Sequence, residues 1–325
     1  MIDNTNEIDK ETISKPKKRN FYVDLLIRLF KEKPLGTFGF VLVLIFLMAG
    51  IFANYIAPFG MNEVHPLDML LRPSGQYLLG TDNLGRDVLS NVIYGARISV
   101  IIGLSASALM TVLCVALGAA SALIGGIFDL LFQRFVDAWL SIPGLLILLT
   151  LVSITGRGMI QVILIIAIPG SIGGSRIIRS AVMAVKENVY VEAAYSIGST
   201  PWRIFTRHIL PHIMPVVIIL FTMGVGDAIM MEAGLSFLGF GVPPGVPSWG
   251  NMLSQEGRQF ALKAPWIALW PGVALSLTIF GVNMFGDAIR DLLDPRIKGK
   301  EGRFGVSHKI VNKILRSQRK STGDV

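Results

Sequence analysis

The hydrophobic pattern of the chain consists of six long apolar runs separated by polar segments. They lie at about 37–57, 98–124, 130–153, 158–177, 214–240 and 266–289. A helix needs roughly 20 mostly apolar residues to cross a bilayer. The fourth run is interrupted by Pro169 and three glycines, which membrane helices tolerate when neighbours satisfy the freed backbone groups. The pattern therefore predicts an all-α membrane protein with six transmembrane helices.

The positive charges orient these predicted spans. With the N-terminus inside, 24 of the 30 Lys and Arg residues fall on the cytoplasmic side, and the opposite orientation would reverse that ratio. Lys and Arg are enriched in cytoplasmic loops of membrane proteins. Both termini are therefore predicted to be cytoplasmic, with external loops at about 58–97 and 241–265.

Composition supports the same class of protein. The chain is 52% hydrophobic and 16% charged, against roughly 25% charged residues in soluble proteins. Its net charge of +8 is explained by topology and by contact with the lipid bilayer, so nucleic acid is not expected as a partner. The single cysteine, Cys114, excludes an internal disulfide. The polar first 20 residues do not resemble a secretory signal, so the first apolar run is expected to be a retained span.

The longest predicted internal cytoplasmic segment carries helix signals at close spacing. A helix over 190–197 would end at Gly198, because glycine takes the left-handed conformation at little cost. Thr200 can cap a second helix that starts at Pro201. That helix is predicted to end at Pro211 and to gather three side chains on one apolar face: Trp202, Phe205 and Ile209. These signals leave two interpretations open, a connector on the bilayer surface or a docking element for a partner.

Charged residues near the spans provide further candidates. Asp227 and Glu232, with Met230 beside them, lie in the fifth run and either face a translocation path or form a hydrogen-bonded packing pair. Asp129, Arg134 and Asp137 are predicted to pair along one helix at the start of the third run.

The external segment 79–99 is expected to form a rigid turn and then a helix, because Asp82 and Asp87 flank Arg86. The turn is either purely structural or part of a surface that receives a partner. The four histidines are scattered along the sequence, and no cluster of His and Cys residues reads as a metal site.

The segment "EAAYSIGSTPWRIFTRHILP" (192–211) resembles the EAA motif of permease subunits of ABC-type importers. The matching residues are Glu192, Ala193, Ala194, Gly198, Leu210 and Pro211. His208 stands where the motif has Ile, and Ile209 follows one place later. Three further stretches, 79–99, 232–253 and 285–296, resemble the C-type permease of dipeptide, oligopeptide and nickel importers. The resemblance covers residues 21–298.

The resemblance implies the type I ABC importer permease fold in a multi-pass protein of the cell membrane. It also implies a homologous B-type permease as partner, two cytoplasmic ATPase subunits and an extracytoplasmic solute-binding protein. The expected function is import of di- or oligopeptides by alternating access, with nickel or another metal chelate as the alternative cargo. The EAA residues are the expected ATPase coupling residues.

The expected division of the chain follows from these assignments. A cytoplasmic tail with an interfacial helix (1–36) precedes the first span and external loop (37–97). The permease core (98–291) contains the EAA coupling loop at 189–211, and a basic cytoplasmic tail (292–325) ends the chain.

The chain is not expected to be an enzyme or to hold a cofactor. It has no G-x-x-x-x-G-K-[ST] phosphate loop, so ATP and Mg would be bound by the ATPase subunits. An intramembrane protease would need His or Lys at membrane depth, and none of the six runs contains either. An ion-coupled secondary transporter usually shows internal repeats, and the two halves show none.

Overall fold

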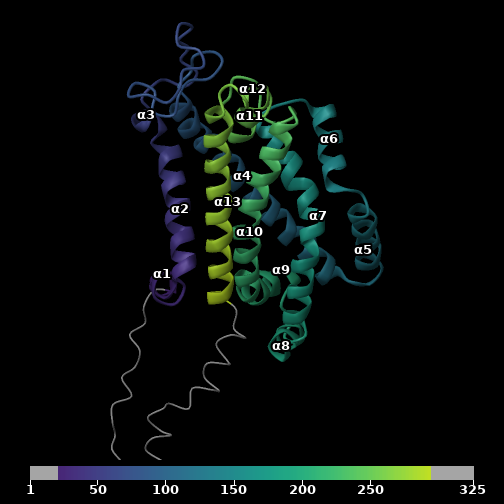
Figure 1. Cartoon of the computed structure of the whole chain (residues 1–325). Helices are drawn as coiled ribbons and strands as arrows, with labels where there is room; N and C mark the ends of the chain where they lie inside the picture. Colours follow the sequence, from purple (N-terminus) through teal and green to yellow (C-terminus); the bar gives the residue numbers. More distant parts are fainter. Residues whose placement is uncertain (1–20, 294–325) are drawn as a thin grey trace, which may run out of the picture.

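The computed structural model describes residues 21–293, which form a helical bundle (Figure 1). Within this part of the chain, five helical segments are long and apolar enough to cross a membrane. Their helices are α2 (Pro34–Ile51), α4 (Val88–Ile124), α7 (Met159–Lys186), α10 (Leu210–Phe237) and α13 (Trp266–Leu293). A bent pair, α5 (Gly126–Leu140) and α6 (Gly144–Thr155), supplies the sixth if it is counted as one span. The predicted all-α class with six spans is confirmed on this count.

The third predicted span, 130–153, is not one continuous helix. Its two halves, α5 and α6, meet at 89°. Pro143 stands at the N-cap of α6, and a proline disfavours helical conformation in the residue before it. The apolar run hid this break because Ser141 and Pro143 interrupt its hydropathy only briefly.

The seam between α4 and α7 is a tightly packed part of the bundle. A side chain added at Gly118 would lie 2.4 Å from the carbonyl oxygen of Ser175 and 2.9 Å from the backbone nitrogen of Arg179. The backbones of the two helices are therefore in direct contact, as small residues permit between membrane helices. α7 continues through Pro169 as one helix. The fourth predicted span, which proline and glycine interrupt in the sequence, is therefore regular, and it packs closely against α4.

The ends of the described chain lie on one side of the bundle (Figure 1). There α1 (Phe21–Glu32) places the buried Leu29 against Ala288 and Leu292 of α13. Lys33 Nζ lies 2.6 Å from Asp291 Oδ2. The helix predicted as interfacial is thus present and is also anchored to the bundle. The basic tail at 292–325 lies outside the described residues from 294 onward.

Short helices occupy the two ends of the bundle (Figure 1). α8 (Val189–Ser196) and α9 (Pro201–Ile204) lie on the same side as α1. α3 (Ala53–Ile56), α11 (Trp249–Leu253) and α12 (Gln255–Phe260) lie on the opposite side with the loop after α3. This division matches the sides predicted from the charges.

Candidate functional site

The segment between α7 and α10 folds into two short helices joined by a tight turn. α8 ends before Gly198, which has φ of 81°. The Gly198 N–H donates to the Tyr195 carbonyl (2.9 Å), and the Ser199 N–H donates to the Ala194 carbonyl (3.1 Å). Thr200 Oγ1 then accepts from the Arg203 N–H, and Pro201 takes the first position of α9. The predicted stop, cap and helix start are confirmed.

The predicted helix end at Pro211 is wrong. α9 passes into a π-helical turn, η1 (Phe205–Ile209), and then into α10, so the helical run extends from Pro201 to Phe237. Proline has no N–H and normally breaks the interior hydrogen bonds of a helix. Here the helix widens just before Pro211, and the Leu210 N–H donates to the carbonyl of Phe205, five residues earlier. A π-helical turn of this kind inserts one residue into a helix without ending it.

One face of this segment is anchored in the bundle. Its buried side chains are Val191, Ala194, Ile204, Phe205 and Ile209, and they pack with buried residues of α4, α7 and α10. Trp202, which was predicted to share this face, is 73% exposed. The helix turns about 100° per residue, so Trp202 lies about 160° from the buried Ile204 and faces outward. Ile209, and not His208, is buried in the core. His208 lies beside the Tyr190 ring of α8.

The opposite face of the segment is an exposed tip, which projects beyond the bundle (Figure 1). Glu192, Ala193 and Gly198 are exposed, as is Pro211, while Leu210 is half-buried. Ile197 is 82% exposed, and Trp202 stands beside the same turn. Exposed apolar groups gathered among polar ones mark protein contact sites. The coupling role of the six EAA residues stays a prediction.

Of the residues predicted for the translocation path, α10 exposes only Asp227 and Met230. Met223 lies one turn from Asp227 on the same exposed stripe. The Asp227 carboxylate makes no hydrogen bond or ion pair with the residues that the structure describes. A lone carboxylate at membrane depth is costly against lipid tails, so this stripe requires a polar environment.

Glu232 does not share that stripe and is fully buried. Its carboxylate accepts hydrogen bonds from Ser236 Oγ (2.7 Å) and Ser99 Oγ (3.4 Å). Five residues separate it from Asp227, which turns the two side chains about 140° apart on a helix. The prediction that Glu232 faces a path is therefore wrong, and the alternative of a hydrogen-bonded packing residue holds for it.

The neighbouring helix α13 adds polar groups to this stripe. Asn283 and Asp287 are exposed on it, one turn apart. The Asn283 carboxamide lies beside Gly226, next to Asp227, since a side chain added at Gly226 would meet Asn283 Oδ1 at 2.8 Å. Both residues lie within the sixth apolar run, and polar side chains at membrane depth are the sequence signal that could have identified them. The two helices together present one polar stripe within an apolar surface.

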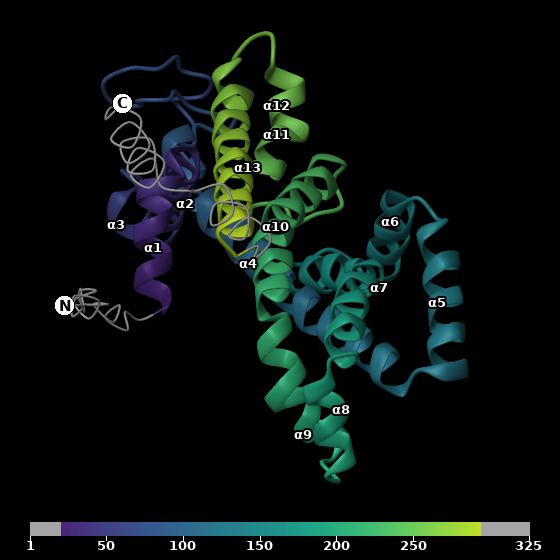
Figure 2. The same cartoon turned by 90° about the horizontal axis from the view of Figure 1, so that it is seen from below.

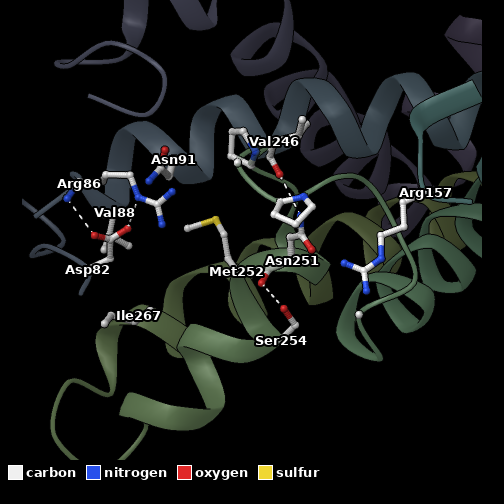
Figure 3. A pocket seen from close by; sticks show the side chains of 14 residues that line it. Asp82, Arg86, Val88, Asn91, Arg157, Val246, Asn251, Met252, Ser254 and Ile267 are labelled. Atoms are coloured by element: carbon white, nitrogen blue, oxygen red, sulfur yellow. Dashed lines mark hydrogen bonds and ion pairs between the residues drawn. The ribbon is translucent and has the colours of Figure 1, made fainter. Parts of the chain in front are cut away.

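A pocket of about 130 Å³ opens on the external side of the bundle (Figure 3). It is built from the segments 82–91 and 239–254, with Arg157 from the α6–α7 turn. Asp82 holds Arg86 (Nε to Oδ2, 2.6 Å), and Asp87 caps α4 through the Ser90 N–H. The predicted rigid turn and following helix are confirmed. Asp82 and Arg157 lie toward opposite ends of the pocket.

The architecture and the exposed apolar helices define a multi-pass membrane protein, and the comparisons give its family. Residues 113–299 match the family described as the binding-protein-dependent transport system inner membrane component. The chain belongs to this family of transport permease subunits. Among the described residues there is no group of three or more His, Cys, Asp or Glu side chains placed to hold a metal ion.

Curated relatives align over most of the chain. The dipeptide transport system permease protein DppC of Alkalihalophilus pseudofirmus is 35% identical over 82% of this chain and 88% of its own length. The glutathione transport system permease protein GsiD of Escherichia coli O6:K15:H31 is 36% identical over 84% of this chain and 90% of its own. Among solved structures, the inward-facing MetNI methionine ABC transporter aligns with a TM-score of 0.47 at 16% identity, covering 63% of this chain and 96% of that one. That distant likeness adds nothing to the fold assignment.

Proposed function

We propose that this chain is the C-type permease of an ATP-driven importer and forms the pathway for di- or oligopeptides with a homologous B-type permease. The observation that carries the proposal is the tip at 192–202, which exposes Ile197 and Trp202 yet is anchored through buried residues to α4, α7 and α10. A surface connector needs neither feature. The names of the relatives, which concern dipeptides and glutathione, support a peptide cargo.

In this proposal two ATPase subunits supply the energy and hold ATP and Mg. One of them grips the tip through Glu192, Ala193 and Gly198, while the half-buried Leu210 and buried Ala194 keep the tip in place. Closure of the ATPase pair displaces the tip. Because the tip shares a packed core with α7 and α10, the displacement tilts those helices and moves the cavity opening from one side to the other.

The stripe of α10 and α13 is the proposed lining of the path. Asp227 would meet the cationic amine of a peptide, and Asn283 beside it would offer further hydrogen bonds. The external pocket, with Arg157 exposed at its edge, belongs to the proposed surface for the extracytoplasmic binding protein. A metal chelate as cargo would use the same machinery, with Met223 and Met230 as soft neighbours of Asp227.

The docking proposal predicts that Glu192→Lys separates the permease from its ATPase. The change reverses one charge at the exposed tip, and we expect ATPase co-purification and ATP-dependent peptide uptake to fall about tenfold, an energy of roughly 1.4 kcal/mol. The matched control is Glu32→Lys, which makes the same change at an exposed site of α1 on the same side. Native levels of ATPase and uptake in Glu192→Lys would refute docking at this residue.

The path proposal predicts a selective defect for Asp227→Asn. Hydrogen bonds to charged groups contribute about 1.5–3 kcal/mol, so uptake of a dipeptide with a free amine should need a roughly tenfold higher concentration or more. The N-acetylated dipeptide serves as the control substrate, because it lacks the cation and should not distinguish the variant from the native importer. If Asp227→Asn leaves the concentration dependence for the free dipeptide unchanged, Asp227 does not bind the amine.

A further inference from the structure

The helix α5 is attached to the bundle with little apolar packing. Val136 is its buried residue, while six large side chains are exposed: Ile127, Phe128, Leu130, Leu131, Phe135 and Leu140. Both views of the fold show α5 at the periphery, beyond α7 (Figures 1 and 2). Its position against α7 must therefore depend on other contacts.

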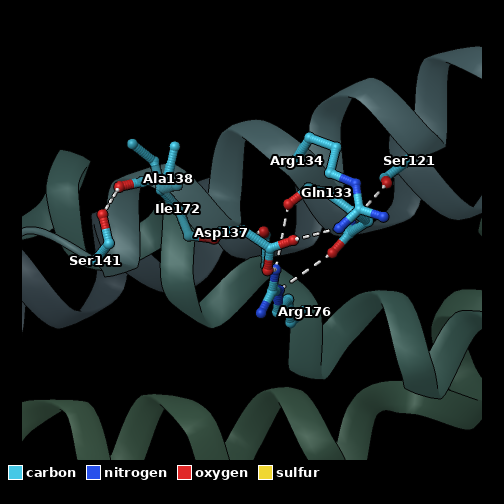
Figure 4. Close-up of polar contacts among 9 residues, drawn as sticks. Ser121, Gln133, Arg134, Asp137, Ala138, Ser141, Ile172 and Arg176 are labelled. Carbon is cyan, nitrogen blue, oxygen red and sulfur yellow. Dashed lines mark hydrogen bonds and ion pairs between the residues drawn. The ribbon is translucent and has the colours of Figure 1, made fainter.

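Two ion pairs between α5 and α7 provide these contacts. Arg179 Nε donates to Asp129 Oδ1 at 2.6 Å, and the same carboxylate accepts from Ser121 Oγ of α4. The second pair joins Arg176 to Asp137 (Figure 4). Arg176 Nε also lies 3.2 Å from Gln133 Oε1. Charge-assisted bonds of this kind are stronger and more directional than neutral ones.

This arrangement corrects the pairing expected from the sequence. Arg134 does approach Asp137 along α5, at 3.4 Å, but its side chain is 76% exposed. Asp129 is held by Arg179 instead. The expected network within one helix is thus a set of contacts between two helices, with the second helix supplying both main arginines.

Both ends of α5 are joints. Gly125 caps its start with φ of 67° and Gly126, its first residue, has φ of 56°, and a side chain added at either would meet nothing within 4 Å. Successive left-handed residues with open space around them let the chain change direction at little cost. The 89° bend to α6 follows at the other end. The ion pairs therefore fix a helix that is jointed at both ends.

The helix that carries the two arginines leads directly to the tip. α7 ends at Lys186, and two residues separate it from α8. The Asn188 side chain closes this joint by donating to the Ala184 and Val185 carbonyls, at 3.2 and 2.9 Å. Lys186 Nζ binds the Ala122 carbonyl of α4 at 3.1 Å. α8 is thus joined directly to the helix that carries Arg179.

We infer that the pairs Asp129–Arg179 and Asp137–Arg176 are positioning contacts for transport. They make α5, and α6 beyond it, follow α7 when the tip moves, so that the displacement of the tip by the ATPase is converted into a change of the whole bundle. This inference rests on the proposed function, because it assigns the ion pairs a part in ATP-driven movement. The inference attributes the coupling of α5 to α7 to the attraction between opposite charges. The coupling should therefore not depend on which of the two helices carries the positive charge.

The test compares single substitutions with a charge exchange in the complete importer reconstituted in vesicles. Uptake per ATP hydrolysed is the measurement, since a contact that only stabilises the protein would lower the amount of complex and leave this ratio unchanged. We expect Asp129→Asn and Arg179→Gln each to lower the ratio about fivefold, within the range of measured pair couplings. The exchange Asp129→Arg with Arg179→Asp should restore it to within about twofold of native.

The control Arg134→Gln removes an exposed arginine of the same cluster and should leave the ratio native. The inference would be overturned if the single variants assemble and keep the native ratio. It would also be overturned if the charge-exchange variant assembles but its ratio stays low. If a single substitution prevents assembly of the importer, the ratio of uptake to ATP hydrolysed is measured instead in Arg179→Lys and in the charge exchange. Absence of ATP-dependent uptake in the native importer would instead contradict the proposed function itself.

Discussion

Replacing Gly198 by valine is expected to lower ATP-driven uptake by tenfold or more while the bundle stays folded. Gly198 has φ of 81°, where an ordinary residue costs roughly 1–2 kcal/mol and a β-branched one more. An added side chain meets nothing within 4 Å inside this chain, so no collision damages the core. The strain instead opens the turn between α8 and α9 and changes the angle at which Glu192 and Trp202 meet a partner.

The measurement is uptake into vesicles alongside the amount of ATPase retained on the purified permease. Gly198→Asn is the matched variant, because asparagine tolerates the left-handed conformation better than other non-glycine residues. We expect it to keep most of the uptake that valine loses. Equal losses in both variants would assign the effect to the contact surface at Gly198, and full activity in Gly198→Val would contradict a role for the turn.

Local features of this segment were predictable because their causes lie within a few residues. Gly198 ends α8, and Thr200 and Pro201 start α9, through hydrogen bonds and backbone preferences that the sequence displays directly. The apolar runs were equally predictable, since bilayer thickness alone sets the length of a span. The charge count also placed the tip on the side where the described chain ends lie.

The contacts between helices were not predictable in the same way. Asp129 pairs with Arg179 because the fold brings α5 and α7, and with them two residues 50 positions apart, together. Rules based on neighbouring residues cannot predict a contact across so large a separation in sequence. Glu232 is different, since its spacing of five from Asp227 already argued against a shared face. The π-helical turn before Pro211 depended on the buried anchor around Ile209, which is itself a product of packing.

A large effect on stability is expected at Gly118, where Gly118→Ala should destabilise the folded protein. Alanine improves helix propensity by about 1 kcal/mol over glycine. Against this, the added carbon would lie 2.4 Å from the Ser175 carbonyl oxygen and 2.9 Å from the Arg179 nitrogen. Both atoms belong to the backbone, so neither can rotate away and α4 must separate from α7. Overpacking of this kind costs about 1–3 kcal/mol, and spreading the seam forfeits further contacts along it.

Thermal unfolding in detergent measures this prediction, with Gly234→Ala as the matched control in α10. An added side chain at Gly234 meets nothing within 4 Å, so only the gain in propensity should remain there. We expect a lower Tm for Gly118→Ala, by roughly 2–4 °C for each kcal/mol lost, and an unchanged or higher Tm for the control. Equal Tm values would contradict direct backbone contact at the seam. Because the Arg179 backbone is among the displaced atoms, the same substitution should also weaken the hold of Arg179 on Asp129.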